Sequence, residues 1–151
     1  MRRNGFTLIE FLVVIAVLAL LASLAAPSFT DQMARRRLEG AGTELATDLQ
    51  FARAQAVSRR GTTTLRTDVG GTGYQVTTAE GIKVVTFPNG VTVTPVDTPV
   101  TFDYVRGMAD NDYVLSLSST HTGGTMNVLV GGVGRVKVCS PGGTLMGVVS
   151  C

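Results

Sequence analysis

The hydrophobic pattern of this 151-residue chain begins with one long apolar segment. From Phe6 to Ala26 there are 21 residues, and Glu10 is the only charged side chain among them. As a helix, this run would extend about 31 Å, which matches the hydrocarbon thickness of a bilayer. The pattern therefore predicts a transmembrane helical half over residues 6–30.

Helical periodicity continues after Pro27, because apolar residues recur at intervals of three or four and form one stripe. The stripe consists of Leu38, Ala41, Leu45, Leu49, Ala52 and Ala56. A proline inside a helix removes one hydrogen bond and usually bends the axis. Two arginines followed by Gly61 are typical of a helix end. We expect one long bent helix over residues 6–60, with an amphipathic second half over 31–60.

After Gly61 the apolar period changes to two, and turn residues separate short β-branched segments. The expected strands lie at 62–69, 73–79, 82–87, 91–96, 100–105, 113–119, 125–130 and 134–139. A sheet must bury one face, and the apolar stripe of the helix is complementary to it. The sequence predicts an α+β fold in which the bent helix packs on an antiparallel β-domain of seven or eight strands over 61–151.

Charge is informative through its distribution along the chain. There are 13 Lys and Arg against 11 Asp and Glu, but Arg2 and Arg3 lie in the leader MRRNG. Without residues 1–5 the positive and negative charges are equal in number, so the net charge gives no argument for nucleic-acid binding. The last 39 residues carry Arg135 and Lys137 and no acid, which makes the tail locally basic. Arg2 and Arg3 also predict a cytoplasmic N-terminus, since basic flanks stay on that side.

A conventional signal peptide is the alternative interpretation of the apolar run. Such a peptide ends in small residues, and Ala25 and Ala26 meet that requirement. It would explain neither Gly5 nor Glu10.

The two cysteines are Cys139 and the final residue, Cys151. In an exported chain, an even number of cysteines indicates a disulfide that ties down the C-terminal end. A metal site is the alternative, but two distant cysteines and the single His121 make a poor tetrahedral set. We expect the disulfide and no metal.

Enzymatic chemistry has little support in the sequence. His121 lies in a turn rich in Ser, Thr and Gly, and no Ser or Cys stands in a recognisable nucleophile setting. The segments GGVG and GGTG precede strands, so neither begins a phosphate-binding helix. We expect no enzyme and no cofactor.

The segment GFTLIE followed by an apolar run resembles the processing signal of type IV pilins and type II secretion pseudopilins. The resemblance covers the leader, Glu10, the apolar helix and Pro27. It implies that a prepilin peptidase cuts after Gly5 and that Phe6 is then N-methylated.

A second motif narrows this resemblance to the GspH/FimT branch of minor pilins and pseudopilins. In that branch a helix-end pattern leads into an all-β domain, and here Leu45, Leu49, Ala52, Arg53, Ala56 and Arg59 match it. The tail GRVKVC is similar to the Gly-Arg-x-Arg before a cysteine in FimT-like pilins. Lys137 replaces the second arginine, which preserves the charge but removes bidentate geometry.

Glu10 needs a partner cation if it lies in an apolar environment. Cleavage after Gly5 would create an α-amino group on Phe6, and the resemblance implies that Glu10 meets this amine on a neighbouring subunit. Such a pair would fix the register between neighbouring subunits rather than stabilise them. The alternative is a helix-end carboxylate that reaches the membrane interface.

Arg135 and Lys137 are the candidate DNA-binding residues. Alternation along a strand would place them about 6.6 Å apart on one face, opposite Val136 and Val138. Resemblance to FimT-like pilins that take up DNA implies sequence-independent contact with double-stranded DNA. A solvated strand face is the alternative interpretation of the same residues.

Together these features predict a minor type IV pilin, made as a single-pass inner-membrane precursor and assembled with other pilins near the pilus tip. Its β-domain would face the periplasm and then the cell surface, where DNA binding would serve natural transformation. The alternative is a GspH-like pseudopilin of a type II secretion system. A third interpretation is an uncut, membrane-anchored β-domain with a receptor or scaffold role.

Overall fold

The computed structural model describes residues 7–143, 145 and 147–151, and of residues 24–28 it describes the helical backbone alone. It contains one α-helix, α1 (Leu8–Arg59), followed by eight strands and a short 3-10 helix, η1 (Pro141–Gly143). The chain divides into two compact units, Met1–Met33 and Ala34–Cys151.

The first unit contains the N-terminal part of α1, and its large apolar side chains are exposed from Leu8 to Leu21. Within the residues that the structure describes, we found no helix with both the length and the hydropathy needed to cross a membrane.

Local hydrogen bonds define both ends of α1. At the start, the Thr7 hydroxyl accepts a hydrogen bond from the backbone N–H of Glu10, as an N-cap side chain does. At the end, the N–H of Gly61 donates to the carbonyl of Ala56, which is the Schellman arrangement. Arg60 takes the left-handed conformation there, with φ at 52°, and Gly61 follows it.

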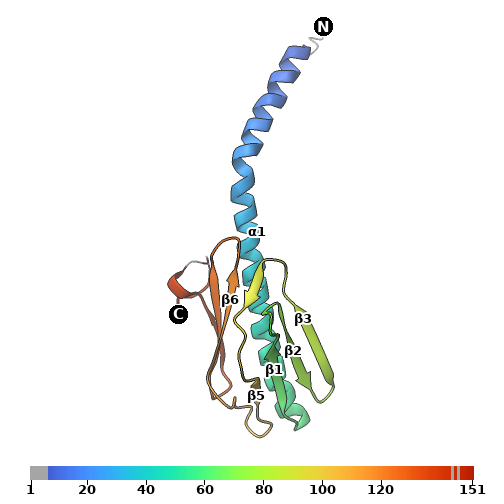
Figure 1. The fold of residues 1–151 in the computed structure, drawn as a ribbon, viewed down its shortest axis with the longest axis vertical. Helices are drawn as coiled ribbons and strands as arrows, with labels where there is room; N and C mark the ends of the chain where they lie inside the picture. Colours follow the sequence, from blue (N-terminus) through green and yellow to red (C-terminus); the bar gives the residue numbers. More distant parts are fainter. Residues whose placement is uncertain (1–6, 144, 146) are drawn as a thin grey trace, which may run out of the picture. The chain divides into compact units, whose positions relative to one another are not determined.

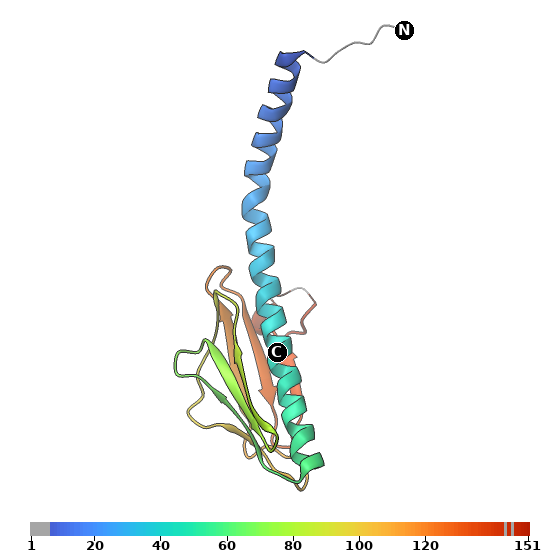
Figure 2. The ribbon, with the colours of Figure 1, turned by 90° about the vertical axis from the view of Figure 1, so that its right-hand side faces the viewer.

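The second unit contains two four-stranded antiparallel sheets, and in Figures 1 and 2 their strands gather along the part of α1 that belongs to the same unit. The first sheet has the order β3-β2-β1-β5, and the second has the order β4-β6-β7-β8. Their bounds are β1 (Thr63–Thr67), β2 (Gly73–Thr78), β3 (Gly81–Thr86), β4 (Val91–Val93), β5 (Val100–Phe102), β6 (Tyr113–Ser119), β7 (Thr125–Val130) and β8 (Val136–Cys139).

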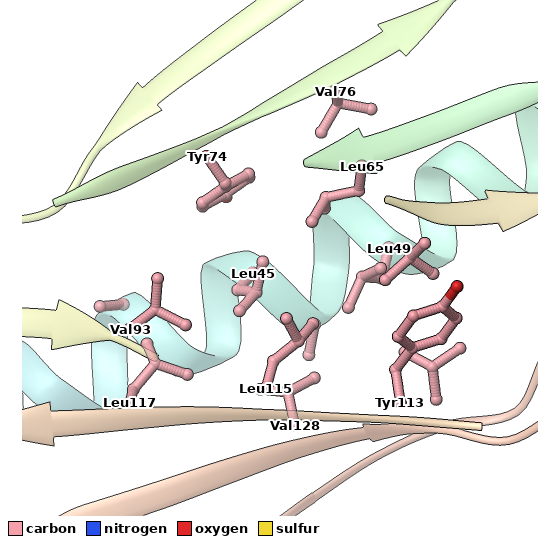
Figure 3. Packing of buried hydrophobic residues seen from close by; sticks show 14 of the residues in the cluster. Leu45, Leu49, Leu65, Tyr74, Val76, Val93, Tyr113, Leu115, Leu117 and Val128 are labelled. Carbon is pink, nitrogen blue, oxygen red and sulfur yellow. The ribbon is translucent and has the colours of Figure 1, made fainter. Parts of the chain in front are cut away.

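One hydrophobic core joins the helix to both sheets. Figure 3 shows Leu45 and Leu49 of α1 between side chains of the first sheet, such as Leu65, and side chains of the second sheet, such as Leu115. All four leucines are fully buried. Burying a side chain of this size contributes about 1.5–3 kcal/mol, so this core is what holds the two sheets on the helix.

The predicted α+β fold is confirmed, and so are its main parts. Every residue of the predicted helical stripe is buried, and each of the eight expected strands overlaps one observed strand. The strands expected at 91–96 and 100–105 are shorter, since Val91–Val93 and Val100–Phe102 alone are paired. Pro95 lies beyond the first of these, where it cannot donate a ladder hydrogen bond.

A buried carboxylate links α1 to the first sheet. Asp48 accepts a hydrogen bond from the hydroxyl of Tyr74 at 2.7 Å and pairs with the Lys83 ammonium at 2.7 Å. Burial, followed by the bond to Asp48, raises the pKa of the Tyr74 hydroxyl above its ordinary value. The ion pair between Asp48 and Lys83 attaches the edge strand β3 to the helix. It also compensates the buried charge of Asp48, which would be costly without a partner.

Candidate functional site

A groove of about 820 Å³ lies in the second unit, between α1 and the β7–β8 hairpin. One wall is the helix face of Gln50, Arg53, Ala54 and Val57. The opposite side is formed by Arg106 and residues 133–136. The groove is therefore lined by three arginines from distant parts of the chain: Arg53, Arg106 and Arg135.

Arg53 holds the two turns that border the groove. Its Nε donates to the carbonyl of Gly107 at 2.8 Å, and its Nη2 donates to the carbonyl of Val133 at 3.4 Å. Both acceptors are neutral, so these bonds position the guanidinium without cancelling its charge. In the part of the chain that the structure describes, no ion pair is formed by Arg53, Arg106 or Arg135.

The strand of the basic tail begins two residues later than the sequence predicts. Strand β8 begins at Val136, so Arg135 lies just before it, in the segment that leads from the turn into the strand. Val136 and Val138 pack against the core, and alternation places Lys137 on the outer face. Arg135 and Lys137 are both exposed, but only Arg135 lines the groove.

The expected disulfide between Cys139 and Cys151 is present, with a Cα–Cα distance of 5.0 Å. Cys139 is the last residue of β8, and Ser140 pairs with Ser150 in an isolated bridge. The disulfide therefore fastens the C-terminus to the end of the strand that carries Lys137.

The N-terminal candidate residues belong to the first unit. Gly5 and Phe6 lie outside the described residues. Glu10 is in the first turn of α1, is exposed, and makes no ion pair within the described part of the chain. Pro27 falls within the span of α1, and a bend there stays a prediction.

Sequence reasoning missed two residues of the groove, Arg106 and the half-buried Arg53. Arg53 matches the helix-end pattern, but nothing in that pattern indicates what its side chain contacts. The sequence feature that could have pointed to the groove is the pairing of arginine with glycine in Arg106–Gly107 and Gly134–Arg135. Among the described residues, no group of three or more His, Cys, Asp or Glu side chains is placed to hold a metal ion.

Comparison with protein-family models shows which family the chain belongs to. The model for the type II transport protein GspH matches residues 41–142, which is more than half of the sequence. The chain belongs to the GspH family. The model for the prokaryotic N-terminal methylation motif matches residues 1–26. No curated protein matched the sequence.

Two kinds of solved structure resemble this GspH family member. The type IV minor pilin FimU of Pseudomonas aeruginosa superposes with a TM-score of 0.58 at 20% identity, over 72% of this chain and 95% of that one. The minor pseudopilin EpsH of the Vibrio cholerae type 2 secretion system gives 0.56 at 14% identity, over 70% and 98%. At these identities the likeness shows the fold alone. That fold is the one shared by minor pilins and pseudopilins, which are structural, non-enzymatic proteins.

Proposed function

We propose that this chain is a minor type IV pilin whose β-domain binds DNA. The proposal has two parts, filament assembly through the N-terminal segment and DNA contact through the basic tail. The N-terminal methylation motif over residues 1–26 supports the first part. The uncompensated cations beside β8 support the second.

For assembly, prepilin peptidase cuts a membrane-anchored precursor after Gly5, and Phe6 becomes the methylated N-terminus. The precursor crosses the inner membrane once with its N-terminus in the cytoplasm, on the basis of the apolar run and the flanking arginines. Glu10 then pairs with the α-amine of a neighbouring subunit. Its exposed position in the first helical turn leaves the carboxylate accessible to such a partner.

For DNA contact, the observation that carries the proposal is the pair of exposed cations Arg135 and Lys137. Neither forms an ion pair within the described residues, and the disulfide fixes the strand end that presents Lys137. Cations of this kind bind the phosphate backbone without reading sequence, and the affinity falls with salt. DNA binding on a filament would serve natural transformation.

A mobility-shift assay with duplex DNA at low salt tests the DNA contact. Arg135→Gln combined with Lys137→Gln should abolish the shift, and transformation of a deletion strain should not be restored by this double variant. Arg60→Gln combined with Arg66→Gln removes the same charge elsewhere and should leave the shift in place. An unchanged shift with the Arg135 and Lys137 variant would refute the contact.

The second candidate function is that of a type II secretion pseudopilin. The GspH family match and the likeness to EpsH support it as well as FimU supports the pilin. Deletion of the gene distinguishes the two: loss of pilus-dependent transformation favours the pilin, whereas loss of protein secretion favours the pseudopilin.

A further inference from the structure

Two arginine–glycine pairs, Arg106–Gly107 and Gly134–Arg135, are far apart in the sequence and meet at one place in the fold. Gly107 follows a short turn in which its N–H donates to the carbonyl of Asp103. Gly134 belongs to the β7–β8 turn and donates to the carbonyl of Gly131. The hydrogen bonds of Arg53 to Gly107 and Val133 hold both turns against α1.

Glycine is favoured at both positions by a left-handed φ and by close neighbours, which are the backbone of the other turn for Gly134 and side chains of α1 for Gly107. Gly134 has φ at 76°, and a Cβ there would overlap the carbonyl oxygen of Gly107 and lie 2.6 Å from Nε of Arg53. Gly107 has φ at 63°, and its Cβ would lie 2.9 Å from a methyl group of Val57. This close approach places the neighbouring residues, Arg106 and Arg135, on the same groove.

The lining of the groove is basic. Within the described residues its lining contains three guanidinium groups and no carboxylate. Guanidinium groups bind phosphate with planar, bidentate hydrogen bonds, and their weak hydration favours such contacts. A volume of about 820 Å³ exceeds what a single carboxylate needs and suits a segment of an extended polyanion.

We infer that this groove is a phosphodiester-binding subsite that extends the DNA contact beyond Arg135 and Lys137. Arg106 and Arg135 bind backbone phosphates of double-stranded DNA. Arg53 is the positioning residue, because it acts on both arginines through the carbonyls of Gly107 and Val133. This inference rests on the proposed DNA-binding function and adds Arg53 and Arg106 to it.

The salt dependence of DNA affinity tests the role of Arg106. The full chain in nonionic detergent is titrated into a labelled duplex at several salt concentrations. Log affinity falls linearly with log salt, and the magnitude of this slope, which is the quantity compared below, counts phosphate contacts. Each lost contact lowers the slope by about 0.9. Arg106→Gln should lower it by about that amount, whereas Arg66→Gln, on the outer face of β1, should leave it unchanged.

Arg53→Lys tests positioning separately from charge. Lysine keeps the positive charge but lacks the forked donors that reach two carbonyls at once. The slope should therefore fall, although the net charge is the same. Circular dichroism and thermal unfolding of each variant identify loss of fold, and the exposed Arg106 keeps the inference testable if Arg53→Lys unfolds.

The outcomes separate this inference from the proposed function. If Arg106→Gln leaves the slope unchanged while the Arg135 and Lys137 double variant lowers it, the groove is not a phosphate subsite and the tail contact stands. If neither lowers it, the DNA-binding function itself fails. If polyglutamate displaces the duplex as well as an equal concentration of unlabelled duplex phosphate does, the groove accepts acidic peptides and the assignment to phosphodiesters is overturned.

Discussion

Nε of Arg53 donates a hydrogen bond to the carbonyl oxygen of Gly107 over 2.8 Å, across 54 positions of the sequence. The same guanidinium reaches the carbonyl of Val133, so one helical side chain fastens two turns. Arg106 and Arg135 flank the turn glycines, and both line the groove beside α1. The positions of Arg106 and Arg135 at the groove therefore depend on the hydrogen bonds that Arg53 makes to the two turns.

Replacement of Gly134 by alanine tests that close packing. Both the left-handed φ and the overlap with Gly107 oppose a Cβ, so we expect a loss of about 2–5 kcal/mol in the free energy of unfolding. Gly123→Ala is the matched control, because Gly123 also has a left-handed φ but no atom within 4 Å of the added Cβ. Its cost should be about 1–2 kcal/mol. Equal losses in denaturant unfolding would show that the two turns do not press on each other.

Tyr74→Phe tests the buried bond to Asp48. At pH 8 the variant should lose about 1.5–3 kcal/mol of stability, because it removes a hydrogen bond to a charged group. Tyr74 has a raised pKa in the fold, so the unfolded chain releases this proton first as the pH rises. The stabilisation by Tyr74 is thus complete below about pH 10 and is lost above it, by up to about 1.4 kcal/mol per pH unit.

The check is a comparison of unfolding free energies for wild type and Tyr74→Phe between pH 8 and pH 11. The difference between the two proteins should narrow above pH 10. Tyr104 and Tyr113 are present in both proteins and cancel from the comparison. Parallel curves over the whole range would contradict the raised pKa.

Removal of the disulfide should lower stability without changing the fold. The bridge joins residues 12 positions apart, and closing a loop of that length contributes about 2–3 kcal/mol through the unfolded state. Cys139→Ser combined with Cys151→Ser should show this loss in denaturant unfolding. Wild type treated with a reductant should show the same loss. A smaller loss in both proteins would show that the disulfide contributes little to stability.

Periodicity was sufficient to predict the main elements of the fold. The stripe from Leu38 to Ala56 recurs at helical spacing, and each strand alternates with period two, so these patterns are local in the sequence. The groove is not local, because it depends on Arg53 reaching Gly107 and Val133. Asp48 was likewise missed, since a lone carboxylate beside an apolar stripe resembles a solvated position. Its partners, Tyr74 and Lys83, become neighbours only when the sheet has formed.

Glu10→Ala tests the assembly role of the carboxylate. We expect the variant to be made and processed but to enter filaments much less than wild type, because the α-amine of the neighbouring subunit loses its partner. Glu44→Ala is the control, since Glu44 is an exposed carboxylate on the same helix. Incorporation of the Glu10 variant at the wild-type level would exclude the pairing and leave Glu10 as a helix-start residue.

The mass of the N-terminal peptide, measured on protein isolated from the native cells, tests the processed-subunit claim most directly. We predict a peptide that begins at Phe6 and carries one added methyl group on its amine. A peptide that begins at Met1 would support an uncut anchored domain, and one that begins after Ala26 would support a conventional signal peptide. Either of these results would contradict the assignment of this chain as a processed filament subunit.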